Sequence, residues 1–283
     1  MGSHYRAEVS LKYKTEYEDV SIQVEGRADG IFTEDGQCWI DEIKGVYADV
    51  SQLEKPVEVH RAQAMCYAWI YAQEQKPEKI GVQMTYGNLD TEELKFFREE
   101  YTLEELSLWY QELLDRYHKW IAYQLAWKKE RNASMSDLEF PFEYREGQRK
   151  IVSGVYHTIS TERQIFVQAP TGVGKTMSTI FPAVRAVGAG LGENIFYLTA
   201  KTITRTVAEE AFSILKEHGL KFKVITITAK EKLCFCDKTE CNPENCLWAR
   251  GHLDRVNDAV FELWTTQDSY DRDTLLEYAK KWQ

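Results

Sequence analysis

The feature that most constrains the fold is the run Ala169-Pro-Thr-Gly-Val-Gly-Lys-Thr176. Glycines in such a loop let backbone N–H groups turn toward a phosphate, and a helix that starts directly after it points its positive dipole end at the same anion. Lys175 would neutralise the β- and γ-phosphates, and the Thr176 hydroxyl would ligate Mg²⁺. Because an apolar segment precedes the run and helical periodicity follows it, the sequence predicts a nucleotide-binding P-loop.

Length and charge bound the organisation of the chain. Its 283 residues suggest two domains, at about 150 residues each. No apolar run approaches the ~20 residues that span a bilayer, and no signal peptide opens the chain, so the expected compartment is the cytoplasm. Residues 1–130 carry the whole net charge of −10. A net negative charge argues against DNA binding. It does not exclude it, because charge is screened over about 8–10 Å and a local basic patch can still bind DNA.

Strand patterns dominate the first part of the chain. Alternating apolar residues indicate strands within residues 5–45, with a hairpin turn at Glu34-Asp-Gly-Gln37. Further along, we expect helices over 58–75, Thr91–Arg98 and Leu103–Lys129, a strand over Lys79–Thr85 and a linker at Asn132–Asp137.

The second part alternates between strand and helix patterns, which predicts a parallel α/β sheet. The expected strands are Gln164–Gln168, Asn194–Thr199 and Phe222–Thr228. The expected helices run from the P-loop to about Ala189 and over Val207–His218, and the chain after Cys246 looks helical to its end.

A set of carboxylates follows the strand pattern of the first part. Residues two apart in a strand share a face, so Glu42 and Lys44 point the same way and Asp29 on a neighbouring strand can join them. Two carboxylates can hold Mg²⁺, which activates water against a phosphodiester, and a lysine can stabilise the charge that develops. Gln63 and Tyr67 are four apart on one helix face.

Four of the six cysteines are crowded together, at Cys234, Cys236, Cys241 and Cys246. In a chain without a secretory signal this crowding favours a metal site over disulfides. The spacing matches neither the usual zinc pair nor the ferredoxin run, so spacing alone leaves the metal open. Cys38 and Cys66 sit inside core elements and are expected to pack.

The P-loop run resembles motif I of superfamily 2 helicases, especially the XPD/DinG group. Tyr144-Arg-Glu-Gly-Gln148 resembles the adenine-side segment of that group, and Leu198-Thr-Ala-Lys-Thr202 resembles motif Ia, which touches the DNA backbone. This resemblance implies DNA-phosphate contacts for Lys201 and, more weakly, Lys230, against the alternative that both are solvated surface lysines. The implied ATP-binding residues are Gln148, Thr171, Gly172, Gly174, Lys175 and Thr176.

The segment Ala229-Lys-Glu-Lys-Leu-Cys234 resembles the start of the iron–sulfur domain of the same helicases. The resemblance implies a [4Fe–4S] cluster held by Cys234, Cys241 and Cys246, with the fourth ligand beyond residue 283. Cys236 is then either spare or a substitute ligand. A zinc knuckle in an unrelated P-loop ATPase is the alternative.

The first part resembles the PD-(D/E)xK nuclease fold of the RecB type. Glu42-Ile-Lys44 matches its signature, and Gln63 with Tyr67 matches the additional Gln-x3-Tyr motif. The resemblance implies catalytic roles for Asp29, Glu42, Lys44, Gln63 and Tyr67, with Asp29 and Glu42 holding the metal. The family pattern begins with an upstream helix that carries a metal-binding histidine, which this sequence does not contain. The right fold without activity is therefore an alternative, and a structural role is expected for His60.

Together these resemblances imply an ATP-dependent DNA helicase of the XPD/DinG type with a fused nuclease domain. Such an enzyme would move on single-stranded DNA, 5′ to 3′ by resemblance, in repair or recombination. A magnesium-dependent nuclease served by the motor and a non-catalytic DNA-binding module are the alternatives.

The expected organisation is a mixed α/β nuclease-like domain over 1–131, a linker over 132–145, the front of a RecA-like motor domain over 146–230 and a partial iron–sulfur domain over 231–283. The sequence has no Asp-Glu-Ala-His-like box and no second motor domain. We therefore expect a fragment that binds nucleotide weakly and does not unwind DNA.

Overall fold

The computed structural model describes residues 5–199, 202–238 and 240–282, apart from the side chains of 202–204. The chain divides into two compact units, Met1–Ala122 and Tyr123–Gln283. Each unit has its own hydrophobic core. None of the described helices is both long and apolar enough to cross a membrane.

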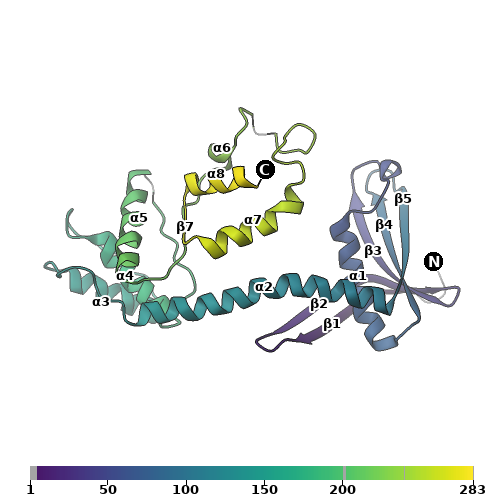
Figure 1. Ribbon diagram of the computed structural model, residues 1–283, viewed down its shortest axis with the longest axis horizontal. Coiled ribbons are helices and arrows are strands. Elements are labelled where there is room, and N and C mark those ends of the chain that lie inside the picture. Colours follow the sequence, from purple (N-terminus) through teal and green to yellow (C-terminus); the bar gives the residue numbers. More distant parts are fainter. Residues whose placement is uncertain (1–4, 200–201, 239, 283) are drawn as a thin grey trace. The chain divides into compact units, whose positions relative to one another are not determined.

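The first unit is built on a five-stranded sheet in the order β1-β2-β3-β4-β5 (Figure 1). Its strands are β1 (Arg6–Glu16), β2 (Ser21–Glu34), β3 (Gln37–Val46), β4 (Lys79–Asn88) and β5 (Leu94–Thr102). Only β3 and β4 pair in parallel. Asp35 and Gly36 turn the β2–β3 hairpin with left-handed φ angles of 53° and 84°, which confirms the predicted turn.

Helix α1 (Glu58–Gln75) lies between β3 and β4 in the chain, because a parallel pair needs a crossover connection. It confirms the helix predicted over 58–75. A short 3-10 turn, η1 (Val50–Gln52), precedes it. Alanines at 64, 68 and 72 are fully buried, so the helix lies close against the sheet (Figure 1).

Two expectations for this part of the chain were wrong. Thr91–Arg98 is not a helix, because Leu94–Thr102 pairs with β4 over its whole length as β5. Helix α2 runs from Leu103 to Ser136, so residues 132–136 of the expected linker are helical. The Arg185 guanidinium donates to the carbonyls of Met135 and Ser136, which satisfies acceptors that a helix end leaves open.

The second unit is mainly helical. Its helices are α3 (Gln148–Ser160), α4 (Lys175–Gly188), α5 (Thr202–Glu217), α6 (Lys230–Leu233), α7 (His252–Thr266) and α8 (Arg272–Lys281). The core lies between α4 and α5, around Ile180, Val184 and Leu215. The α4 and α5 positions agree with the predicted helices.

The predicted parallel sheet of the second unit is largely missing from the described residues. Only β6 (Val224–Ile225) and β7 (Ser269–Tyr270) pair, in parallel. Residues 164–168 and 194–199 have no ladder, and Phe166 is 96% exposed and Leu198 89%. A strand needs neighbouring strands for its backbone hydrogen bonds, and within the described chain neither segment is paired in a sheet.

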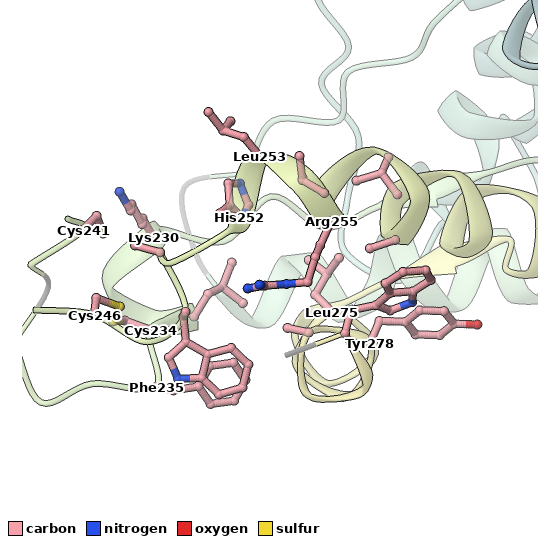
Figure 2. A pocket seen from close by; sticks show the side chains of 18 of the residues that line it. Lys230, Cys234, Phe235, Cys241, Cys246, His252, Leu253, Arg255, Leu275 and Tyr278 are labelled. Atoms are coloured by element: carbon pink, nitrogen blue, oxygen red, sulfur yellow. The ribbon is translucent and has the colours of Figure 1, made fainter. Parts of the chain in front are cut away.

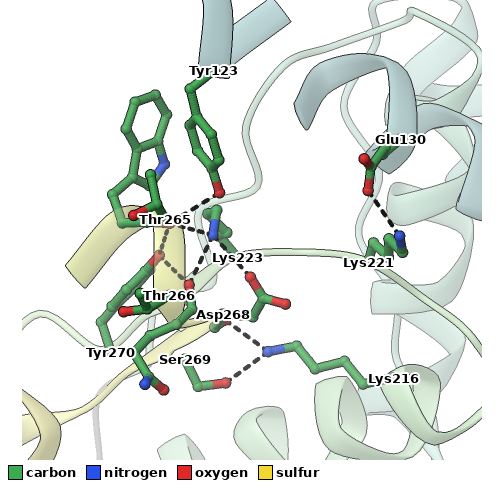
Figure 3. A network of polar contacts seen from close by, with 12 residues as sticks. Tyr123, Glu130, Lys216, Lys221, Lys223, Thr265, Thr266, Asp268, Ser269 and Tyr270 are labelled. Carbon is green, nitrogen blue, oxygen red and sulfur yellow. Dashed lines mark hydrogen bonds and ion pairs between the residues drawn. The ribbon is translucent and has the colours of Figure 1, made fainter. Parts of the chain in front are cut away.

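Lysines join the β6–β7 pair to the surrounding helices (Figure 3). The Lys223 ammonium donates to the carbonyls of Trp264 and Gln267 and to the Asp268 carboxylate, at 2.6–2.8 Å. It also lies 4.2 Å from the Trp127 ring centroid, within cation–π range. The Lys216 ammonium donates to the Asp268 carbonyl. These bonds position the segment between α7 and α8.

Candidate functional sites

The P-loop has the local geometry that its sequence predicts. Gly172 and Gly174 have left-handed φ angles of 84° and 74°, which glycine adopts without strain. Helix α4 begins directly after the loop, at Lys175. The Lys175 ammonium donates to the carbonyls of Ala169 at 2.8 Å and Pro170 at 2.7 Å. The loop therefore combines turned backbone, a helix N-terminus and a lysine, which together suit a polyphosphate.

Two residues at the start of α3, Arg145 just before it and Gln148 in its first turn, contact this loop. Gln148 is 4% exposed, and its Oε1 accepts from the Arg145 backbone N–H at 2.8 Å. A Cβ atom on Gly174 would lie 2.5 Å from Gln148 Nε2, so the two residues touch. Arg145 also donates to the Gly172 carbonyl. Sequence reasoning identified Gln148 but missed Arg145, because only the folded loop brings that guanidinium to Gly172.

The remaining predicted residues of the motor domain are more scattered. Thr171 is exposed in the loop, and Thr176 is half-buried in the first turn of α4. Lys230 interacts with a cysteine: the Cys241 side chain raises the pKa of the Lys230 ammonium. Lys201 lies outside the described residues.

The five residues predicted for the nuclease site come together in the first unit. The Lys44 ammonium donates to Glu42 Oε1 at 2.5 Å and to Gln63 Oε1 at 3.3 Å. Gln63 Nε2 donates to the Tyr67 hydroxyl at 3.3 Å. Asp29 Oδ2 accepts from the Ile43 backbone N–H at 2.7 Å, next to Glu42 in β3. Strand β3 and helix α1 thus supply one chain of hydrogen-bonded side chains, and Asp29 of β2 is bonded to the backbone next to it.

Glu42 is the unusual member of this cluster. Its side chain is 1% exposed, and its Oε2 has no hydrogen-bond partner among the described residues. Burial raises the pKa of the Glu42 carboxyl, the hydrogen bond from Lys44 opposes that shift, and the Asp29 carboxylate adds to it. A buried carboxylate oxygen without a partner, beside a second carboxylate, fits a divalent cation. Mg²⁺ often uses one or two carboxylates and completes its shell with water and phosphate oxygens.

Asp41, next to Glu42 in sequence, belongs to a different cluster. Its Oδ1 accepts from Thr85 Oγ1 at 2.6 Å and from Gln83 Nε2 at 3.0 Å. Its Oδ2 accepts from the Tyr5 hydroxyl at 3.1 Å. Adjacent residues of a strand point to opposite faces of the sheet, so the Asp41 side chain makes its hydrogen bonds on the face opposite to the Glu42 cluster.

Gly26 of β2 lies against Tyr67 of the nuclease-like cluster. A Cβ atom on Gly26 would lie 2.5 Å from the Tyr67 hydroxyl. The close approach of β2 to Tyr67 therefore requires glycine at this position. Sequence reasoning missed this role, because glycine in a strand pattern does not reveal which side chain approaches it.

The cysteine-rich segment has suitable donors but an incomplete arrangement. Cys236 Sγ and Cys246 Sγ are 4.0 Å apart. Cys234, Cys241 and Cys246 line a cavity of about 590 Å³, and Figure 2 shows them near one end of it. Thiolates are the ligands of iron–sulfur clusters. However, across the described parts of the chain no three His, Cys, Asp or Glu side chains are arranged to hold a metal ion.

The two other cysteines lie in the first unit. Burial raises the pKa of the Cys66 thiol to about 11 and also raises the pKa of the Cys38 thiol. Both pack against the hydrophobic core, as predicted.

Comparison with known proteins assigns the segment that contains the P-loop. A family model described as "DEAD/DEAH box helicase" matches residues 145–244. No curated protein matches the chain. A solved structure described as the crystal structure of SSO0001 is 22% identical, with a TM-score of 0.26, and the match covers 35% of this chain and 42% of that one. The chain therefore spans less than half of the length of that relative.

The family match covers the part of the second unit that contains the P-loop. Residues 145–244 match the model of DEAD/DEAH box helicases, which supports a superfamily 2 helicase and ATP binding. The P-loop geometry at Gly172, Gly174 and Lys175 falls within the matched residues.

Proposed function

We propose that this chain belongs to an ATP-dependent DNA helicase of the XPD/DinG type, with a fused RecB-like nuclease domain. The observation that carries the nuclease half is the hydrogen-bonded chain of Glu42, Lys44, Gln63 and Tyr67, with Asp29 bonded to the backbone of Ile43 beside Glu42. The motor half rests on the helicase domain and its braced P-loop. The two together describe a protein that moves along single-stranded DNA and cuts it.

Each motor residue has a role that follows from its place in the loop. The amides of Gly172 and Gly174 would bind a phosphate group, and Lys175, which now donates to two backbone carbonyls, would donate to phosphate oxygens instead. Thr176 contributes its hydroxyl to the Mg²⁺ that accompanies ATP. Gln148, which accepts from the Arg145 backbone, would contact the adenine base. ATP hydrolysis then drives movement on DNA.

In the nuclease half, Asp29 and Glu42 would hold Mg²⁺, which polarises the phosphodiester and lowers the pKa of a water molecule. Glu42 uses Oε2 for this purpose, because Oε1 already accepts from Lys44. Lys44 stabilises the negative charge that develops on the phosphate. Gln63 fixes the Lys44 ammonium, and Tyr67 fixes Gln63.

For the cysteine-rich segment we propose a [4Fe–4S] cluster with Cys234, Cys241 and Cys246 among its ligands. Support comes from the helicase class and from the three thiols that line one cavity. The test is the anaerobic absorbance spectrum with iron and sulfide analysis. Brown protein that contains both elements is expected, whereas colourless protein that contains zinc and no iron would contradict the proposal.

The experiment that tests the overall function separates the two sites. Purified protein is incubated with labelled single-stranded DNA and Mg²⁺, and a fluorescent ATP analogue is titrated in parallel. We expect cleavage that Lys44→Ala abolishes and Lys175→Ala leaves intact, and analogue binding with the opposite pattern. Cleavage that persists in Lys44→Ala at the wild-type rate would refute the nuclease assignment.

One observation favours the alternative in which cleavage is the main activity and the motor only supplies DNA. The five predicted nuclease residues lie together within one unit, whereas the motor segments 164–168 and 194–199 are not paired as strands with other described residues. Cleavage without ATP, at the same rate as with ATP, would support that alternative.

A further inference from the structure

His60 lies beside the nuclease-like cluster but takes no part in the chain of bonds described above. It is on α1, three residues before Gln63 and seven before Tyr67, so the three residues share one helix face. Its Nδ1 is 3.1 Å from the Tyr86 hydroxyl. Of the residues that the structure describes, none bonds to its Nε2. One ring nitrogen is therefore held and the other is open.

The bond to Tyr86 fixes which nitrogen of His60 carries the proton. The Tyr86 side chain is 1% exposed, and its hydroxyl oxygen already accepts from the Val57 backbone N–H at 2.9 Å. A buried hydroxyl hydrogen without an acceptor costs about 1–3 kcal/mol. The hydroxyl therefore donates to Nδ1, and a neutral His60 holds its proton on Nε2.

The surroundings keep this imidazole neutral. Burial lowers the pKa of His60, and the nearby Lys44 ammonium lowers it further. Tyr86, which holds His60, is the register partner of Lys44 across β3 and β4, so the imidazole lies on the same part of the sheet as that ammonium. Its Nε2–H is thus a neutral donor on the side of the catalytic residues.

We propose that His60 Nε2–H donates a hydrogen bond to a non-bridging oxygen of the phosphodiester that is cut. This inference rests on the proposed nuclease function. Lys44 is already committed to Glu42 and Gln63, so a second, neutral donor adds stabilisation as negative charge grows on the phosphate. Tyr86 is then a positioning residue, because it acts only by fixing the tautomer of His60.

Two substitutions at position 60 separate this role from a structural one. In His60→Gln the amide nitrogen reaches the place of Nε2 and can donate to phosphate. In His60→Asn the shorter amide stays at the level of Nδ1 and keeps only the contact with Tyr86. We expect His60→Gln to retain kcat/KM within about tenfold, and His60→Asn and His60→Ala to lose roughly 10²-fold or more, the effect of one lost transition-state donor.

The opposite ranking, with Asn more active than Gln, would overturn the inference while leaving the nuclease function intact. A wild-type chain without Lys44-dependent cleavage would overturn the nuclease function and the inference with it. ¹⁵N NMR of the histidine rings gives a readout that needs no activity, with the His60 signal assigned by its loss in His60→Gln. A protonated Nε2 and an unprotonated Nδ1 are expected, and the reverse tautomer would overturn the proposal.

Discussion

Replacing Glu42 by glutamine should stabilise the first unit at neutral pH. Burial raises the pKa of the Glu42 carboxyl in the folded state, even though Lys44 opposes the shift. A group whose folded pKa is raised favours folding below its unfolded pKa, about 4.3 for glutamate. That advantage is lost as the pH rises through the folded pKa. At pH 7 the wild-type chain therefore contains a disfavoured buried charge, and the glutamine variant does not.

The size of this effect follows from the burial and the bonding of the side chain. Glu42 is 1% exposed, and one of its two oxygens has no partner among the described residues. An unsatisfied buried group costs about 1–3 kcal/mol, and more when it is charged. Glutamine keeps an oxygen that can accept from Lys44. We expect Glu42→Gln to raise the free energy of unfolding by roughly 1–3 kcal/mol at pH 7 and by almost nothing near pH 4.

The assay is urea unfolding without divalent cations at the two pH values, with tryptophan fluorescence as the probe. The matched control is Glu18→Gln on the exposed surface, which should change stability by less than about 0.5 kcal/mol. Because the chain has two units, the transition of the first unit must be fitted separately. A Glu42→Gln variant that is less stable than wild type at pH 7 would refute the reasoning. The ion pair between Glu42 and Lys44 would then stabilise the fold by more than burial of the charged carboxylate destabilises it.

Three further substitutions test individual contacts. Lys44→Ala should destabilise the first unit by about 3–5 kcal/mol in urea unfolding at pH 7, because it leaves a buried carboxylate unpaired; a loss below about 1 kcal/mol would argue against that pair. Gly26→Ala should cost about 1–3 kcal/mol and slow cleavage, because its Cβ would lie 2.5 Å from the Tyr67 hydroxyl; unchanged cleavage kinetics would count against it. Gly174→Ala should weaken binding of an ATP analogue more than Gly172→Ala. Both glycines have left-handed φ angles, but only a Cβ atom at position 174 would contact a neighbouring side chain, that of Gln148. Equal losses of affinity in a fluorescence titration would contradict this.

Local patterns predicted the elements whose partners are close in sequence. The β2–β3 hairpin and helix α1 follow from a turn signal and a helical period, and both formed where expected. Thr91–Arg98 was misread because a short segment with adjacent phenylalanines fits either period, and pairing with β4 decides the outcome. The motor strands depend on distant neighbours for their hydrogen bonds, so sequence pattern alone could not say whether they form.

In the nuclease-like cluster and the P-loop, too, motif residues were predicted from the sequence, whereas residues that matter through long-range contacts were not. The five residues of the cluster were identified from motifs, and their proximity agrees with strands and a helix that bring fixed positions together. Gly26 and Arg145 were not found, because their importance lies in contacts with Tyr67 and Gly172 across the fold. The separation of Asp41 from Glu42 follows from strand alternation and could have been stated beforehand.

The most direct test of the nuclease assignment is the binding of a divalent cation to the cluster itself. Mn²⁺ can replace Mg²⁺ at oxygen sites, and its binding can be counted by electron paramagnetic resonance in the absence of nucleotide. The account predicts one Mn²⁺ site that Asp29→Asn and Glu42→Gln each remove and that Lys175→Ala leaves unchanged. Equal Mn²⁺ binding by wild type and Glu42→Gln would contradict it.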